Sequence, residues 1–186
     1  MPERLHPIKR TVLQIARERP VDTITAEELA TAAGVDVTDV HKLGLSVVDV
    51  TEAALDELLG HLEEDMALIA TRDTNEFALV ADSHRMILEH LIDYAPIYLS
   101  SNTDRLWRVI THRFFIYLNQ RIEFHPERLP FQDASERDKK MLATYTAAGT
   151  VAAMEVWLRS GDTRDLDDAV TVIFAAAPAW IFDSSR

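Results

Sequence analysis

The sequence predicts an all-α protein of about nine helices, in which a small N-terminal helix-turn-helix head is joined to a larger helical body. Apolar residues recur at helical spacing along most of the chain, and residues typical of helix N-caps stand directly before these stretches. No convincing strand pattern, internal repeat or low-complexity tract is present. We expect residues 1–50 to form the head and residues 51–186 the body.

Composition excludes several classes of protein. The chain has 186 residues, 47% of them hydrophobic, and no cysteine, which rules out disulfides, thiolate metal sites and cysteine nucleophiles. No apolar run reaches the roughly 18 residues of a membrane helix, and the N-terminus has no signal-peptide core. We therefore expect a soluble, cytoplasmic protein without membrane contact.

Charge is distributed unevenly along the chain. The net charge of -12 opposes non-specific binding to nucleic acid. Residues 1–19 hold five basic and two acidic side chains, a net charge of +3, which leaves -15 on the rest of the chain. The sequence thus predicts a weakly basic end on an acidic body, a contrast that identifies no ligand by itself.

The first two helices follow from apolar spacing and from a cap. Apolar residues at helical spacing within residues 8–16 predict the first helix, with Pro7 in its first turn. Thr25 and Glu28 have the spacing of a capping box, which predicts a second helix at about residues 26–33.

The remaining helices are predicted in the same way. Asp36 precedes a third, short helix, and Ser46 with Asp49 precedes a fourth that runs on through about residue 70. Further helices are expected near residues 76–94, after Pro96, and at about 103–124, 135–160 and 165–183. Pro178 should kink the last helix or lie near its end.

Residues 23–46, TITAEELATAAGVDVTDVHKLGLS, have the pattern of a helix-turn-helix. Gly34 accepts the backbone geometry of the tight turn, and apolar residues such as Leu29 and Val40 can pack the two helices together. The second helix of such a unit lies in the major groove of DNA. Here it carries acidic residues near a single lysine, Lys42.

Two stretches resemble the TetR family of bacterial transcriptional regulators. They are ITAEELATAAGVDVTDVHKLGLSVVDVTEAAL near the N-terminus and YTAAGTVAAMEVWLRSGDTRDLDDAV near the C-terminus. The resemblance implies a three-helix DNA-binding head, a body that binds a small molecule, and a homodimer built from the last two helices. Three positions depart from the family pattern: His41 replaces a common tyrosine, Gly44 a phenylalanine and Val47 a lysine. The tyrosine and the lysine usually hold phosphates, so we expect weaker contacts to the DNA backbone.

Candidate DNA contacts lie in the head. Residues of the two helices and of the basic N-terminal arm are expected to contact bases or phosphates: Arg4, Lys9, Arg10, Thr25, Thr38, Asp39, His41 and Lys42. The alternative is that the basic residues only solvate a helix, and that the head is a packing unit without DNA affinity.

Candidate ligand and dimer contacts lie in the body. Aromatic and methionine side chains could line a mostly apolar cavity of at least roughly 300 Å³, although such residues also form ordinary cores: Met86, Tyr94, Tyr98, Trp107, Phe114, Phe115 and Tyr117. His84, His112 and Asn119 could orient a ligand. Small residues and two tryptophans could form the dimer interface or belong to the subunit core: Ala147, Ala148, Gly149, Ala152, Ala153, Trp157 and Trp180.

No enzyme, metal site or cofactor is predicted. His61 and Asp65 stand four residues apart, but no dense ligand set accompanies them, and no nucleophile elbow, phosphate loop or acid pair is present. We expect a TetR-like regulator, a repressor, that binds a palindromic operator in double-stranded DNA as a homodimer and is released by an apolar effector. The alternative is a ligand- or partner-binding protein whose head no longer binds DNA specifically.

Overall fold

A computed structural model describes residues 2–42, 44–70, 76–101, 103–124, 126–129, 133–163 and 165–181. Within these ranges all regular structure is helical, as predicted. The α-helices are α1 (Pro2–Ala16), α2 (Ala26–Ala33), α3 (Val37–Lys42), α4 (Val47–Ala70), α5 (Glu76–Asp93), α6 (Ala95–Tyr98), α7 (Thr103–Phe124), α8 (Glu136–Ser160) and α9 (Leu166–Ala176). Short 3-10 helices span Val21–Thr23, Pro126–Arg128 and Ala179–Ile181.

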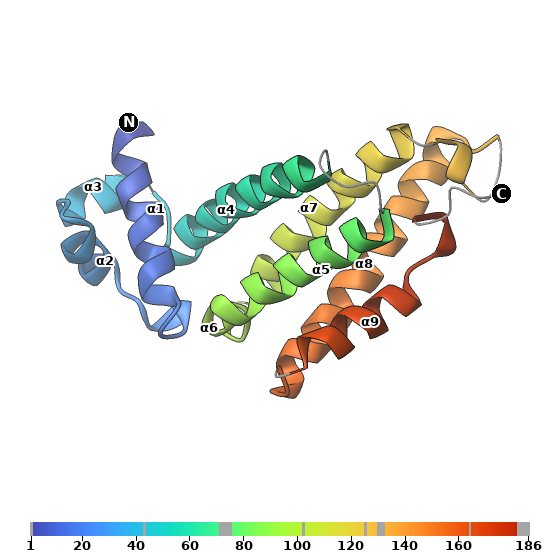
Figure 1. Ribbon diagram of the computed structural model, residues 1–186. Coiled ribbons are helices and arrows are strands. Elements are labelled where there is room, and N and C mark those ends of the chain that lie inside the picture. The colour runs from blue at the N-terminus through green and yellow to red at the C-terminus, as the bar shows by residue number, and fades with distance from the viewer. Residues whose placement is uncertain are drawn as a thin grey trace.

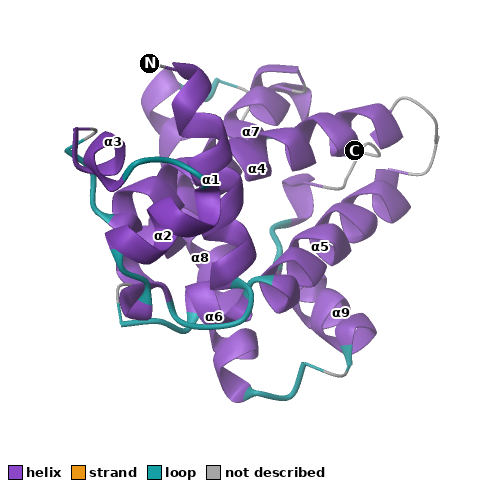
Figure 2. Cartoon of the chain, turned by 90° about the vertical axis from the view of Figure 1, so that its left-hand side faces the viewer, coloured by secondary structure: helices purple, strands orange, loops and turns teal. Residues whose placement is uncertain are grey.

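Helices α1 to α3 form the head at one end of the molecule, and α4 leads from them into the body (Figure 1). Apolar side chains of all four helices bury each other, because each helix presents one apolar stripe to the same core. Ile8, Val12, Leu29, Val40 and Val50 are each at most 2% exposed. The view along the head shows α1, α2 and α3 stacked in front of the body (Figure 2).

Local sequence determines where the helices of the head begin and end. The Thr25 hydroxyl accepts a hydrogen bond from the Glu28 N–H at 3.2 Å, which caps α2. Gly34 ends α2 in the left-handed conformation, with φ of 67°. The carboxylate of Asp36 accepts the Thr38 N–H at 2.7 Å and so caps α3. Gly44 (φ 64°) then turns the chain toward α4.

A reciprocal capping box begins α4. The Ser46 hydroxyl accepts the Asp49 N–H at 3.2 Å, and the Asp49 carboxylate accepts the Ser46 N–H at 2.8 Å. Helix α4 then runs without interruption from the head core, where Val50 and Ala54 are buried, to the body, where Leu59 is buried. It therefore crosses the boundary expected at residue 50.

The body packs α7 between α4 and α8, with α5 on α9 and α6 on α7 (Figure 1). Its buried residues continue the core of the head without a break along α4. Within the described ranges, no helix combines the length and the apolar composition that a membrane crossing requires.

Two helix ends differ from the prediction. Helix α1 begins at Pro2, so Pro7 lies inside it rather than in its first turn, and the helix lacks the bond that an amide at this position would donate. Helix α9 ends at Ala176, well before residue 183. Ala177 adopts extended backbone angles because it precedes Pro178, whose ring disfavours the helical conformation there. The expectation that Pro178 lies near the end of this helix is confirmed.

Candidate functional sites

The short helix α3 presents a small polar surface to solvent. Thr38, His41 and Lys42 are exposed, and the side chain of Lys42 is 73% exposed. Its Nζ atom lies 3.5 Å from a carboxylate oxygen of Asp39, one turn earlier on the same helix. The surface therefore carries a lysine whose charge is partly balanced by its own helix.

The other candidate contacts of the head differ in availability. Arg10 is exposed on α1, and Thr25 is exposed at the start of α2. The Nζ atom of Lys9, in contrast, donates to Glu57 of α4 at 3.0 Å, and this contact lowers the pKa of the Glu57 carboxyl. Lys9 thus ties α1 to α4, and a phosphate would have to compete for it. The side chain of Arg4 lies outside the described residues.

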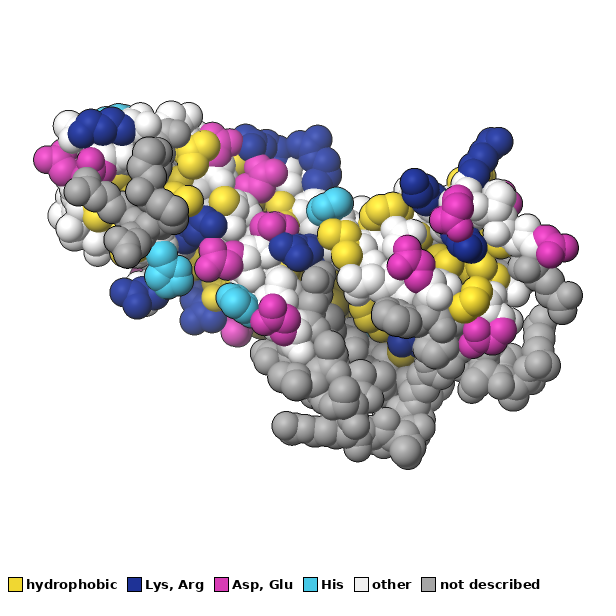
Figure 3. Space-filling model, turned by 90° about the horizontal axis from the view of Figure 1, so that it is seen from above, with side chains coloured by type: hydrophobic (Ala, Val, Ile, Leu, Met, Phe, Trp, Pro, Cys, Tyr) yellow, Lys and Arg dark blue, Asp and Glu magenta, His cyan; other side chains and the backbone are white. Residues whose placement is uncertain are grey.

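Acidic and basic side chains are mixed at the head end of the face shown in Figure 3, where they form no continuous basic surface. A phosphate backbone is attracted most strongly by an uninterrupted basic face. On this side the head therefore offers separate cations rather than a wide positive field.

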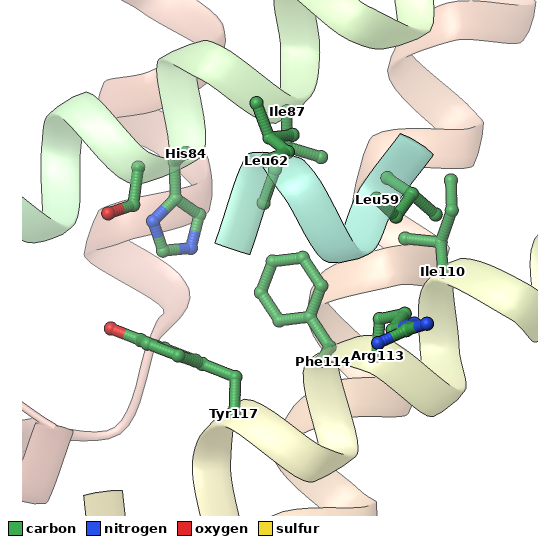
Figure 4. Close-up of a pocket in the computed structure, with 9 residues that line it drawn as sticks. Leu59, Leu62, His84, Ile87, Ile110, Arg113, Phe114 and Tyr117 are labelled. Carbon is green, nitrogen blue, oxygen red and sulfur yellow. The ribbon is translucent and has the colours of Figure 1, made fainter. Parts of the chain in front are cut away.

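A pocket lies in the body between α4, α5 and α7 (Figure 4). Its walls are mainly aliphatic and aromatic, with a few polar groups, and consist of Leu59, Leu62, Ser83, His84, Ile87, Ile110, Arg113, Phe114 and Tyr117. The cavity measures about 30 Å³, which is room for about one or two water molecules. This pocket is thus far smaller than the roughly 300 Å³ expected of a ready-made ligand site.

Two buried polar residues line this pocket, Ser83 and His84, and His84 carries the larger polar group. The residue is 7% exposed, and its Nδ1 atom lies 2.7 Å from the carbonyl oxygen of Val80. Burial lowers the pKa of the imidazole, which the hydrogen bond to Val80 only partly offsets. Its ring stands edge-on to Phe114, with centroids 6.0 Å apart. His84 is therefore a neutral, fixed imidazole at neutral pH.

Arg113 connects the pocket to α4. Its Nε atom donates to the Asp56 carboxylate at 2.7 Å, and its Nη2 atom donates to the Asp56 carbonyl at 2.8 Å. Gly60 of α4 lies beside the guanidinium, and a Cβ atom added there would make an ordinary van der Waals contact with its nitrogens, at 3.5 Å. The Asp56 carboxylate on α4 thus compensates the guanidinium charge of Arg113.

Of the seven side chains expected to line a cavity, Phe114 and Tyr117 line this pocket. Met86 and Phe115 are half-buried against the core and lie outside its lining. Aromatic content alone does not tell a cavity wall from a filled core, so the pattern could not separate these two groups. The wall residues Leu59, Ile87 and Ile110 have the ordinary aliphatic spacing of a helix core, so no sequence signal distinguished them.

Tyr94, Tyr98 and Trp107, also expected at the cavity, form a packed cluster near the head instead. The Tyr98 hydroxyl lies 2.9 Å from Nε2 of His90, and the indole N–H of Trp107 donates to the Tyr98 carbonyl at 3.2 Å. The guanidinium of Arg17, at the end of α1, lies 4.5 Å from the centre of the Tyr94 ring. This cluster joins the head to the body. Its three aromatic residues are not part of the pocket lining described above.

Small and apolar side chains form an exposed stripe along α8, the α8 stripe. By helical spacing its members share one face: Met141, Tyr145, Ala148, Gly149, Ala152 and Val156. Tyr145 is 78% exposed and Val156 71%, and Val172 of the neighbouring α9 is 59% exposed. Contiguous exposed apolar side chains of this kind often mark a protein–protein contact.

The other candidate dimer residues pack within the subunit. Ala147 is fully buried, which corrects its assignment to an interface. Ala153, Trp157 and Trp180 are half-buried against the subunit core. The indole N–H of Trp180 is buried and meets no hydrogen-bond partner among the described residues.

Titratable side chains do not assemble into a metal site in the part of the chain that the structure describes. His61 lies 3.4 Å from Glu64, and the side chain of Asp65 is outside the described residues. His84 lines the pocket, whereas His90 contacts Tyr98 in the aromatic cluster.

Solved structures show which fold this is. No family model matches the chain, and no curated protein matches it. FadR of Thermus thermophilus, a TetR-family repressor solved with lauroyl-CoA, is 15% identical with a TM-score of 0.67, over 92% of this chain and 91% of its own. The fatty acid degradation regulator FadR of Bacillus halodurans is 14% identical with a TM-score of 0.64, over 98% and 97%. A TetR-family regulator of Streptomyces coelicolor is 14% identical with a TM-score of 0.61, over 94% and 79%. The chain has the fold of TetR-family transcriptional regulators.

Proposed function

We propose that the chain is a transcriptional repressor that binds a palindromic operator as a homodimer and releases it when a small, mostly apolar effector enters the body. The observation that carries this proposal is the position of α3, which follows the Gly34 turn and presents Thr38, His41 and Lys42 outward from a TetR-type head. A helix placed in this way fits the major groove.

The α8 stripe supports the homodimer. A two-fold interface uses the same patch on both subunits, and α8 offers an apolar patch with small residues at its centre. Gly149 lies in the middle of α8, and a Cβ atom there would meet nothing within 4 Å in its own subunit. Since glycine weakens a helix, its presence is best explained by the close approach of a second α8.

Helix α4 supports a coupling between effector and head. Leu59 and Leu62 of α4 line the pocket, and Asp49 begins the same helix beside the head. Because the cavity measures about 30 Å³, an effector would have to separate its walls and displace α4. A ligand that binds the widened state better shifts the population toward it, and DNA binding then opposes effector binding by the same factor.

The second candidate function is a ligand- or partner-binding protein whose head no longer recognises DNA. The pairing of Lys42 with Asp39 and of Lys9 with Glu57 favours it, because these lysines are less available to phosphates. Asp36 adds a further negative charge beside α3, although it is engaged in capping that helix.

Selection of DNA fragments from a random pool tests the proposal. The full chain should enrich a two-fold symmetric sequence and bind it, in fluorescence anisotropy at low salt, at least about tenfold more tightly than a scrambled duplex. Equal and weak binding to both duplexes would establish the second candidate instead. Light scattering of the same sample should give about twice the subunit mass of 21.0 kDa.

A further inference from the structure

The protonation of His84 fixes what its pocket-facing nitrogen can do. The Val80 carbonyl can only accept a hydrogen bond, so the Nδ1 atom 2.7 Å away must carry the proton. In the neutral ring the Nε2 atom then bears a lone pair and is a hydrogen-bond acceptor. No other described residue makes a hydrogen bond with this ring. Among the described residues, this acceptor in a mainly apolar pocket therefore has no donor.

The surroundings of His84 favour a hydroxyl as that donor. Figure 4 shows the hydroxyl end of Tyr117 on the same side of the pocket as the His84 ring. Arg121 donates to the Tyr117 oxygen at 3.5 Å, which leaves the Tyr117 hydrogen to be donated elsewhere. A ligand hydroxyl can donate to His84 and accept from Tyr117, whereas an N–H group can only donate.

The remaining walls disfavour an anion. Leu59, Leu62, Ile87, Ile110 and Phe114 provide no group that could stabilise a buried negative charge. Arg113 is the cation among the lining side chains, and it already contacts Asp56 through both its Nε and Nη2 atoms. An anionic ligand would have to break these contacts.

We propose that the pocket binds a small neutral alcohol or phenol, whose hydroxyl donates to Nε2 of His84 while its apolar part separates Leu62 from Phe114. Leu62 is half-buried, so its side chain can turn outward and widen the cavity, while Tyr117 stays beside His84 to donate to the ligand. This inference rests on the proposed effector site and adds the chemical class of the effector.

Three probes of similar shape test the inference on the full chain: para-cresol, para-xylene and para-toluate. Para-cresol should bind about tenfold more tightly than para-xylene, since a hydrogen bond in an apolar site contributes about 1 kcal/mol or somewhat more. Para-toluate should bind more weakly than either. In ¹H–¹⁵N spectra of the histidine rings, the unprotonated nitrogen of His84 should shift with para-cresol and stay in place with para-xylene.

Variants separate this hydrogen bond from a general effect on the fold. His84→Phe should abolish the preference for para-cresol over para-xylene, and His84→Gln, which keeps an acceptor, should restore part of it. Ile92→Val is the matched control, because Ile92 lies on the same helix as His84 but is exposed and outside the pocket lining, and it should keep the preference. Equal binding of para-cresol and para-xylene, tighter binding of para-toluate, or no response of His84 to any probe would overturn the inference. None of these outcomes affects the DNA selection experiment, which uses no effector.

Discussion

The Nη2 atom of Arg105 on α7 donates to the Asp49 carboxylate in the first turn of α4 at 2.7 Å. Arg105 of the body thereby holds α4 at Asp49, the same residue that takes part in the cap of this helix. The capping bonds from Ser46 and then the contact with Arg105 lower the pKa of Asp49 to about 2. One carboxylate thus joins the cap of α4 to the body.

We expect Ser46→Ala to raise the pKa of Asp49 more than Arg105→Gln does, because the bonds from Ser46 are the larger cause of the shift. Carboxyl carbon shifts in an NMR titration measure both values. Since the pKa in the folded state lies below the unfolded value near 3.9, the stability that Asp49 contributes is complete above about pH 4 and is lost as the pH falls toward 2. A larger effect of Arg105→Gln would show that the ion pair dominates.

Protonation of His90 should destabilise the fold. His90 is 9% exposed and lies 2.9 Å from the Tyr98 hydroxyl, and burial, with a smaller effect of the Arg17 charge, lowers the pKa of His90 to about 4. Because the unfolded pKa is about 6.5, the unfolded chain binds the proton first, and about 3 kcal/mol of stability should be lost as the pH falls from about 6.5 to 4. Urea unfolding across this range should show a shallower loss for His90→Gln. An unchanged slope would mean that His90 does not titrate in this way.

Gly149→Ala should have opposite effects on the subunit and on the dimer. The added methyl group meets open space within the subunit and raises helix propensity by about 1 kcal/mol. In a close contact between two α8 helices the same methyl group would hold the helices apart. We therefore expect thermal stability to rise under dilute monomeric conditions while the dimer, measured by analytical ultracentrifugation, dissociates more readily.

A charge in the α8 stripe provides a second test of the dimer. Tyr145→Glu should yield a folded monomer, because the side chain is 78% exposed in the subunit and its replacement leaves the core unchanged. Gln120→Glu on α7 adds the same charge at an exposed position outside the stripe and should leave the dimer intact. A dimer that tolerates Tyr145→Glu would place the interface elsewhere.

Substitutions in α3 should distinguish phosphate contacts from base contacts. Lys42→Ala should weaken binding to all duplexes and reduce the salt slope by about 0.9 for each phosphate that is no longer neutralised. Thr38→Ala should instead change the order of preference among duplexes, if Thr38 contacts a base edge. Anisotropy titrations at several salt concentrations measure both effects. If Lys42→Ala leaves the salt slope unchanged, Lys42 remains with Asp39 in the complex.

Local signals made most helix starts predictable. Thr25, Ser46 and Asp165 each accept the N–H of the residue three positions later, which is a short-range interaction that the sequence displays directly. The end of α9 was less predictable, because the apolar spacing continues through Ala177, whereas Pro178 disfavours the helical conformation at that residue. In residues 171–182, TVIFAAAPAWIF, the apolar helix pattern extends beyond Pro178, although the helix itself ends before this proline.

The pocket could not be predicted from helix patterns, since they show which side chains face inward but not whether the facing helices fill the space between them. Tyr98 and Phe114 look alike in the sequence, yet Tyr98 is fully buried beside His90 and Trp107 while Phe114 borders a cavity. The role of Arg113 depends on Asp56, a residue 57 positions away that only the tertiary fold brings near. Such pairings depend on helix packing rather than on local propensity.

The uninterrupted course of α4 sets a rotational phase between the two ends of the molecule. Its 24 residues span about 36 Å, and each residue adds about 100° of turn and 1.5 Å of rise. Inserting one residue between Leu55 and Leu59 would therefore turn the head by more than a quarter of a revolution relative to the pocket while lengthening the helix only slightly. For a symmetric pair of heads, such an insertion would misalign both α3 helices at once, whereas a four-residue insertion would nearly restore their direction and change mainly the distance between them.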